Sequence, residues 1–206
     1  HYNVDLSKEA DKKRAISEYN RYVCCLPSRQ NEDGTNAPEQ LDSGHIFRLG
    51  DTWWVCATPA CDLQPGQSII AFNKGGDTSL RPFTAIKLYR SGPDTLTHHH
   101  INSGSYCYIE YLGEIIGLGI RPSKDDVSSP AIQKVEWRTF VAERRGMINN
   151  RTLSLLEIQL EFKENSMKSE RKEAEVVAKL RYEYALNYIQ RIGASVSRIG
   201  LGYEAS

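Results

Sequence analysis

The central part of the chain is a succession of short apolar segments separated by turn residues, and this pattern restricts the fold more than any other feature. The segments 45–49 and 53–57 flank Gly50-Asp51, a dipeptide typical of a tight β-hairpin. Further strands are expected at 68–72, 82–90, 105–111, 114–120, 134–142 and 151–162. About eight short strands joined by turns predict a strongly bent antiparallel sheet or a small barrel.

Near the N-terminus the hydrophobic period becomes that of a helix. The segment 7–24 is expected to be helical, with Ser7 as its N-cap, and Pro27 ends it. Its apolar stripe consists of Ala15, Ile16, Tyr19, Tyr22 and Val23. This stripe is expected to face the core, because surface helices bury their apolar side.

Near the C-terminus a second, longer helix is expected over about 166–192, with Gly193 as its C-cap. Its apolar stripe consists of Val177, Leu180, Tyr184, Tyr188 and Ile192. The outer face carries the ion pairs Glu164–Lys168 and Glu175–Lys179, four residues apart. The tail 197–203 is interpreted as a short terminal strand or a docking segment.

Together these elements predict an α+β fold with an N-terminal helix, a β-rich centre and a long C-terminal helix. The expected divisions are 1–30 (N-terminal helix), 31–43 (exposed linker loop), 44–163 (β-rich core) and 164–206 (C-terminal helix and tail packed on the core).

Charge balance and cysteine count exclude several classes of protein. The chain has 26 Lys and Arg and 26 Asp and Glu, whereas domains that bind polyanions usually have a basic excess. Its five cysteines, an odd number in a long chain, favour a reducing, cytoplasmic compartment. No apolar run of about 18 residues predicts a membrane span, and no motif implies a cofactor. The chain begins with His1, so we expect further sequence before it.

Cysteine and histidine residues are the first candidates for chemistry. Cys61 and Asp62 follow an apolar strand and a proline turn, where scaffolds often present functional groups. Cys61 would be a nucleophile if a histidine stabilised its thiolate. We favour the alternative in which Cys61 packs inside and Asp62 binds backbone N–H groups. His98 and His100 could face one metal ion, with His45 or Cys61 completing the site, although a polar loop is favoured because the usual ligand spacing is absent.

Basic residues are the second set of candidates, as contacts for phosphates. They are Arg48, Arg138, Arg144, Arg145 and Arg198. Glu136 and Glu143 are interleaved with them, so the local charge is nearly balanced. Arg198 stands alone in an otherwise apolar tail, and we expect it to pair with a carboxylate such as Asp62.

Three segments resemble a bacterial family of response-receiver proteins: 42–48 (DSGHIFR), 58–63 (TPACDL) and 197–203 (SRIGLGY). In that family a phosphoacceptor receiver domain precedes a region like this one, and some members lie beside histidine-kinase-like ATPases in mobile or anti-phage loci. The resemblance covers most of the chain from residue 42 onward. It implies an output region for signalling or antiviral defence, with a receiver domain or such an ATPase as its protein partner, and it assigns no catalytic residue.

Three functions follow from these observations. The favoured one is a regulatory or interaction module without catalysis of its own. The alternative is a nucleic-acid-binding or ribonuclease-like domain, because a bent sheet with the strand start Gly44-His45-Ile46-Phe47 is similar to the SH3-like barrels of toxin endoribonucleases. The third is a thiol or metal site centred on Cys61. No membrane partner is expected.

Overall fold

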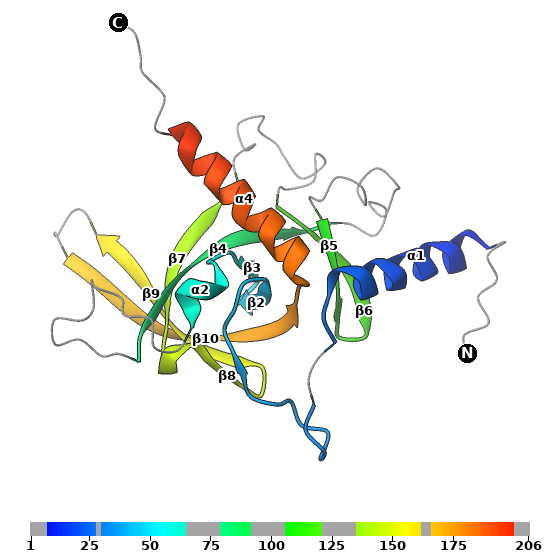
Figure 1. Cartoon of the computed structure of the whole chain (residues 1–206), viewed down its shortest axis with the longest axis horizontal. Coiled ribbons are helices and arrows are strands. Elements are labelled where there is room, and N and C mark those ends of the chain that lie inside the picture. The colour runs from blue at the N-terminus through cyan, green and yellow to red at the C-terminus, as the bar shows by residue number, and fades with distance from the viewer. Residues whose placement is uncertain are drawn as a thin grey trace, which may run out of the picture.

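The computed structural model describes residues 8–27, 30–64, 79–91, 106–120, 135–161 and 166–199 (Figure 1). Its helices are α1 (Glu9–Cys24), α2 (Ala60–Leu63) and α4 (Tyr182–Ile199), and a 3-10 turn lies at Arg144–Gly146. Its strands are β1 (Glu39–Gln40), β2 (His45–Leu49), β3 (Thr52–Cys56), β4 (Arg81–Arg90), β5 (Tyr106–Tyr111), β6 (Glu114–Gly119), β7 (Trp137–Ala142), β8 (Met147–Asn149), β9 (Thr152–Glu161) and β10 (Ser166–Lys179). The predicted α+β class is confirmed, while the strand expected at 68–72 lies outside the described residues.

Six of the strands close into an antiparallel barrel. Strands β2, β3 and β4 pair in sequence, β4 pairs with β7, β7 with β9, β9 with β10, and β10 returns to β2. The β5–β6 hairpin joins the end of β4, and β8 connects β1 to β9. The predicted small barrel is therefore confirmed, and closure leaves these six strands without a long open edge.

The barrel interior is filled by aromatic and branched side chains. Phe47, Phe83 and Phe140 pack against one another with ring centroids 5.7–5.8 Å apart, and Trp54 meets Phe140 edge to face at 5.1 Å. Edge-to-face and offset arrangements are the favourable geometries for such rings. The remaining members of this inner core are Leu41, Cys56, Leu63, Ala85, Ala142, Ile148, Leu153, Leu155, Ala174 and Val176.

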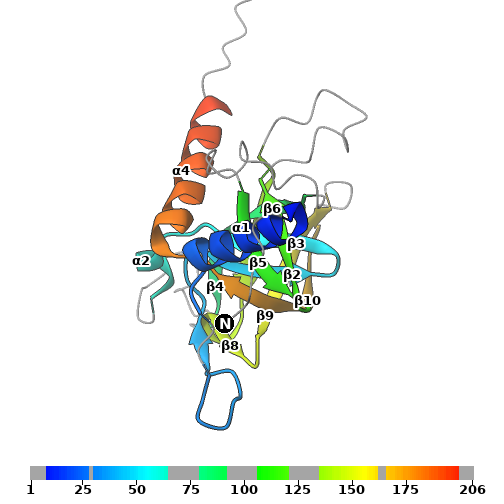
Figure 2. The ribbon, with the colours of Figure 1, turned by 90° about the vertical axis from the view of Figure 1, so that its right-hand side faces the viewer.

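A second core lies on the outside of the barrel, under α1, α4 and the β5–β6 hairpin. Figure 2 shows α1 crossing this hairpin on one side of the barrel, with α4 rising beside it. Strands β2 and β3 supply side chains to both cores, since neighbouring residues on a strand point to opposite faces. Ile46 and Trp53 face the outer core, whereas Phe47 and Trp54 face the inner one. Burial on both faces explains why these two strands are almost continuously apolar.

The prediction of a helix over 166–192 is wrong for the first half of that range. Residues Ser166–Lys179 form the 14-residue strand β10, and the helix runs from Tyr182 to Ile199, through Gly193 rather than ending there. A bulge between Val176 and Ala178 explains the error: it adds one residue and breaks the two-residue period. The expected ion pair between Glu175 and Lys179 does not form. The Glu175 carboxylate accepts from the Tyr111 hydroxyl, and Lys179 pairs with Asp42.

Gly44 allows α4 to pack closely against the barrel. Gly44 has a φ of +84°, and its N–H and C=O bond to the Cys56 carbonyl and the Leu180 N–H. A Cβ atom at this position would lie 2.8 Å from the Cβ of Ala185 in α4 and 3.1 Å from that of Leu180. The backbone turn and the close helix contact therefore both require glycine.

We expect Gly44→Ala to lower the free energy of unfolding by about 2–5 kcal/mol, which combines the strain of a positive φ with overpacking against Ala185. Gly50→Ala is the matched control, because Gly50 also has a positive φ of +58° but no atom within 4 Å of its Cβ position. The control should lose about 1–2 kcal/mol from backbone strain alone. Urea unfolding of both variants measures the difference, and equal losses would contradict the packing role of Gly44.

Candidate functional site

The main pocket lies between β1, the start of β2, α2 and the end of β10, and has a volume of about 580 Å³. Its apolar lining is Leu26, Pro27, Ala37, Pro38, Leu41, Leu63, Ile148, Val176, Val177 and Ala178. Five ionisable residues also line it: Glu39, Asp42, His45, Arg151 and Lys179. Apolar walls with a few fixed polar groups are typical of ligand-binding pockets.

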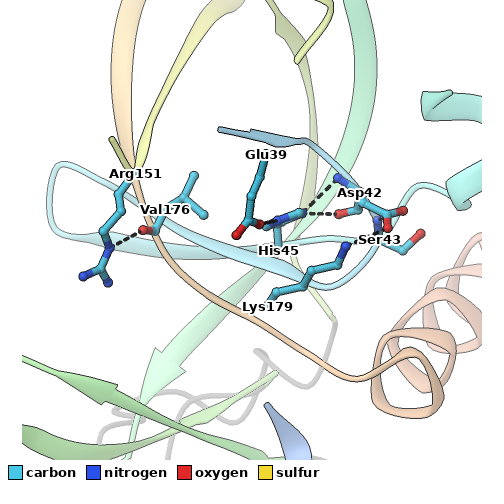
Figure 3. Close-up of polar contacts among 7 residues, drawn as sticks. All are labelled: Glu39, Asp42, Ser43, His45, Arg151, Val176 and Lys179. Atoms are coloured by element: carbon cyan, nitrogen blue, oxygen red, sulfur yellow. Dashed lines mark hydrogen bonds and ion pairs between the residues drawn. The ribbon is translucent and has the colours of Figure 1, made fainter. Parts of the chain in front are cut away.

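His45 is buried and holds two neighbouring segments together. The Asp42 backbone N–H donates to His45 Nδ1 at 2.9 Å, and the Asp42 carbonyl oxygen lies 3.0 Å from the same ring nitrogen. His45 Nε2 lies 3.1 Å from Glu39 Oε2 and donates to it. The ring therefore fixes the Glu39 carboxylate on the pocket wall (Figure 3).

Asp42 and Ser43 join the ends of three barrel strands. Asp42 Oδ1 accepts the Ser43 N–H at 2.7 Å, and Asp42 Oδ2 accepts Lys179 Nζ at 2.8 Å. The Ser43 hydroxyl donates to the Thr58 carbonyl at 2.6 Å. The start of β2 is thus tied to the segment after β3 and to the last residue of β10. Part of the segment 42–48 that carries the family resemblance has a structural role here.

Arg151 is anchored by main-chain carbonyls at the β10 bulge. It lies in the β8–β9 turn with a φ of +62°, and its Nε and Nη2 donate to the carbonyls of Val176 and Val177 at 3.0 and 2.9 Å. No acidic side chain forms an ion pair with it among the described residues. Figure 3 shows its guanidinium directed away from the Glu39–His45 cluster.

A second pocket of about 380 Å³ adjoins the first. The two share Leu26, Pro27, Arg151, Val177 and Ala178, and the second adds Arg21, Cys25, Glu110, Tyr111, Leu112, Gly113 and Glu175. We call the two pockets together the α1–β10 groove. Its acids and bases are balanced and mostly paired, for example Arg21 with Glu110 at 3.3 Å. The groove is therefore suited to a ligand that carries both acidic and basic groups rather than to a polyanion.

Exposed tyrosines beside the groove were missed by the sequence pattern. Tyr19 and Tyr22 were expected in the buried stripe of α1, but they are 68% and 70% exposed, and Tyr182 at the start of α4 is 64% exposed. The Arg181 guanidinium lies 5.9 Å from the centre of the Tyr22 ring and donates to the Tyr22 carbonyl at 3.3 Å. We call Tyr19, Tyr22, Arg181 and Tyr182 the tyrosine face. Arg21, which precedes Tyr22 in α1, lines the second pocket of the groove.

The structure does not assemble the predicted thiol site. Cys61 is exposed rather than packed inside, and its thiol donates to Asp62 Oδ1 at 3.3 Å. The Asp62 side chain does not cap α2, contrary to the loop-capping interpretation. His45 bonds to Glu39 and Asp42 instead of to Cys61. His98 and His100 lie outside the described residues, within which no group of three or more His, Cys, Asp or Glu side chains is placed to hold a metal ion.

The predicted basic residues lie on four separate segments: β2, β7, the turn before β8, and α4. Arg48 bonds to Tyr111 and Asp51, and Arg138 pairs with Glu157 at 2.8 Å. Arg144 and Arg145 are exposed on the turn before β8. The backbone of Arg198 lies in α4, but its side chain, and with it the expected pair with Asp62, lies outside the described part of the structure.

Comparison with protein-family models, curated proteins and solved structures finds no match for this chain. The resemblance to response-receiver proteins therefore stays a prediction. Among the residues that the structure describes, no helix combines the length and the apolar character needed to cross a membrane.

We expect the Asp42–Lys179 ion pair to contribute about 0.5–1 kcal/mol of coupling, since both side chains are only partly exposed. A double-mutant cycle with Asp42→Asn and Lys179→Met measures it by urea unfolding, because Asn keeps the oxygen that accepts the Ser43 N–H. The same cycle on Arg48 and the fully exposed Asp51 is the control and should show no measurable coupling. Equal coupling in the two cycles would show that the groove pair is merely a surface contact.

Proposed function

We propose that this chain is a regulatory or interaction module that binds a partner protein with its tyrosine face and the adjoining α1–β10 groove. The observations that carry this proposal are three exposed tyrosines, two of them on α1, and a preformed groove that the end of α1 lines with Arg21 and Cys25. Exposed aromatic side chains are costly to leave in water, and they are enriched at protein interfaces. Tyrosine and arginine are also the residue types that most often dominate binding energy.

The geometry of the tyrosine face supports a binding role. Arg181 is held over Tyr22 by its ring contact and by its bond to the Tyr22 carbonyl. Its N–H also donates to the Cys24 carbonyl at 2.9 Å, so the residue is fixed at both its backbone and its side chain. A side chain that is already ordered loses less conformational entropy on binding. The face therefore combines large contact area with preorganisation.

The ionisable groups of the groove favour binding over catalysis. Ser43 donates to a carbonyl, and the buried His45 orients a carboxylate instead of activating a hydroxyl or thiol. The Ser43 hydroxyl donates to a carbonyl rather than to a base, and the Cys61 thiol donates to the Asp62 carboxylate, whose negative charge disfavours the thiolate. The balanced charge of the groove favours a protein segment over a nucleic-acid backbone. The receiver domain implied by the family resemblance is the partner that we propose.

Photo-crosslinking in cells of the native host tests this proposal. We expect p-benzoylphenylalanine in place of Tyr22 to give one discrete protein adduct on irradiation, because the partner would cover this exposed ring. Mass spectrometry of the adduct should identify a receiver domain. The aromatic replacement at an exposed position preserves the fold.

The matched control places the same photoreactive residue at Trp137, an exposed aromatic side chain at the start of β7. This position should give no discrete adduct. Identical adducts at both positions would contradict a specific interface at the tyrosine face. Crosslinking of position 22 to nucleic acid instead of protein would support the ribonuclease-like alternative.

A further inference from the structure

Two adjacent cysteines form a buried pair of thiols where α1 meets the barrel. The Sγ atoms of Cys24 and Cys25 lie 3.8 Å apart. Both are within hydrogen-bonding distance of the Tyr108 carbonyl oxygen on β5, at 3.1 and 3.2 Å. The Tyr108 N–H donates back to Cys24 Sγ at 3.3 Å. The two thiols thus converge on one residue of the β5–β6 hairpin.

The backbone at this pair links three elements. Cys24 is the last residue of α1, and its carbonyl accepts the Arg181 N–H at the start of α4. Cys25 is extended and forms a β-bridge with Leu180, and the next N–H, that of Leu26, donates to the Lys179 carbonyl. A covalent change at the pair would therefore act on the joint between α1, β10 and α4.

The chemistry of this pair differs from that of the other cysteines. The hydrogen bond from the Cys25 thiol lowers the pKa of Cys24, which favours the reactive thiolate, and the same contact together with burial raises the pKa of Cys25, so the pair ionises once, at Cys24. Cys25 lines the second pocket of the groove, so a small reagent has a path to the pair. Burial raises the pKa of Cys56 and of Cys107 to about 12, which keeps these two thiols protonated. Cys61 is exposed, and its thiol donates to the Asp62 carboxylate instead of meeting a second thiol.

We propose that Cys24 and Cys25 are a redox site that a hydroperoxide converts into a reversible vicinal disulfide. The Cys24 thiolate attacks one peroxide oxygen, the O–O bond breaks, and with one added proton the products are Cys24 sulfenic acid and water. The Cys25 thiol then attacks the sulfenic sulfur, the S–O bond breaks, and a second water leaves. In sum, two thiols and one hydrogen peroxide give one disulfide and two water molecules.

The geometry of neighbouring residues makes such a disulfide easy to reduce. Consecutive Cα atoms are about 3.8 Å apart, whereas disulfides usually need at least about 4.4 Å between Cα atoms. A bond formed under this constraint is strained, and strained disulfides have the more oxidising potentials typical of labile, regulatory ones. Oxidation also removes both S–H donors from the Tyr108 carbonyl. This inference does not depend on the proposed function.

Peptide mapping tests the proposal in a Cys61→Ser background, which removes the exposed thiol. Trypsin cleaves after Arg21 and Arg29, so the peptide 22–29 contains Cys24 and Cys25 and no other cysteine. After hydrogen peroxide treatment, denaturation and alkylation, we expect this peptide to be unalkylated and lighter than the dithiol peptide by two hydrogens, about 2 Da. Dithiothreitol should restore alkylation at both positions. Amide exchange should rise at Leu26 and Arg181, whose N–H bonds flank the pair.

A Cys25→Ser variant in the same background separates the two steps. It lacks the resolving thiol, so dimedone should trap a sulfenic acid on Cys24 and the two-hydrogen loss should disappear. The proposal is overturned if peptide 22–29 stays fully alkylated at a peroxide concentration that oxidises Cys61 in the unchanged protein. It is also overturned if Cys24 or Cys25 is found joined to Cys107 instead.

Discussion

The rest of the structure depends on the change of pairing partner that β10 makes at its bulge. Up to Glu175 the strand pairs with β9, and from Glu175 onward it pairs with β2, which closes the barrel. Val176 faces the inner core, and at the bulge the next two residues, Val177 and Ala178, both pack against the outer one. The bulge also frees the two carbonyls that anchor Arg151. One irregularity therefore connects barrel closure, the division between two cores and the wall of the groove.

The polar residues near this junction mainly connect the ends of neighbouring strands. Asp42 binds the last residue of β10, and His45 links the start of β2 to Glu39 in β1. Because these groups bond to one another, they hold this wall of the groove in place. The exposed surface beside it is different: Tyr19, Tyr22 and Tyr182 have large apolar rings in contact with solvent. The polar residues thus hold the fold together, whereas the exposed tyrosines are available to contact another molecule.

The sequence predicted local features well and failed where distant segments meet. The Gly50-Asp51 hairpin follows from turn chemistry alone, and the small barrel follows from the number of short strands. Strand β10 was mistaken for a helix because the bulge at Val177 gives Val177 and Leu180 a helical spacing. The outward Tyr19 and Tyr22 were missed because α1 buries the side that carries Ser17 and Cys24. The Asp42–Lys179 contact joins residues 137 positions apart, which no local pattern records.

The pairing of β2 with β10 has a consequence for how the chain is made. Phe47 of the first barrel strand pairs with Val176 of the last. The side chains of Leu180 and Ala185 pack against Gly44. During synthesis the β2–β3 hairpin leaves the ribosome long before its partner, so one edge of β2 stays open until β10 emerges. Folds dominated by such distant contacts form slowly, and open apolar edges invite aggregation. Barrel closure therefore waits until β10 has been made, and the edge of β2 is open to other contacts until then.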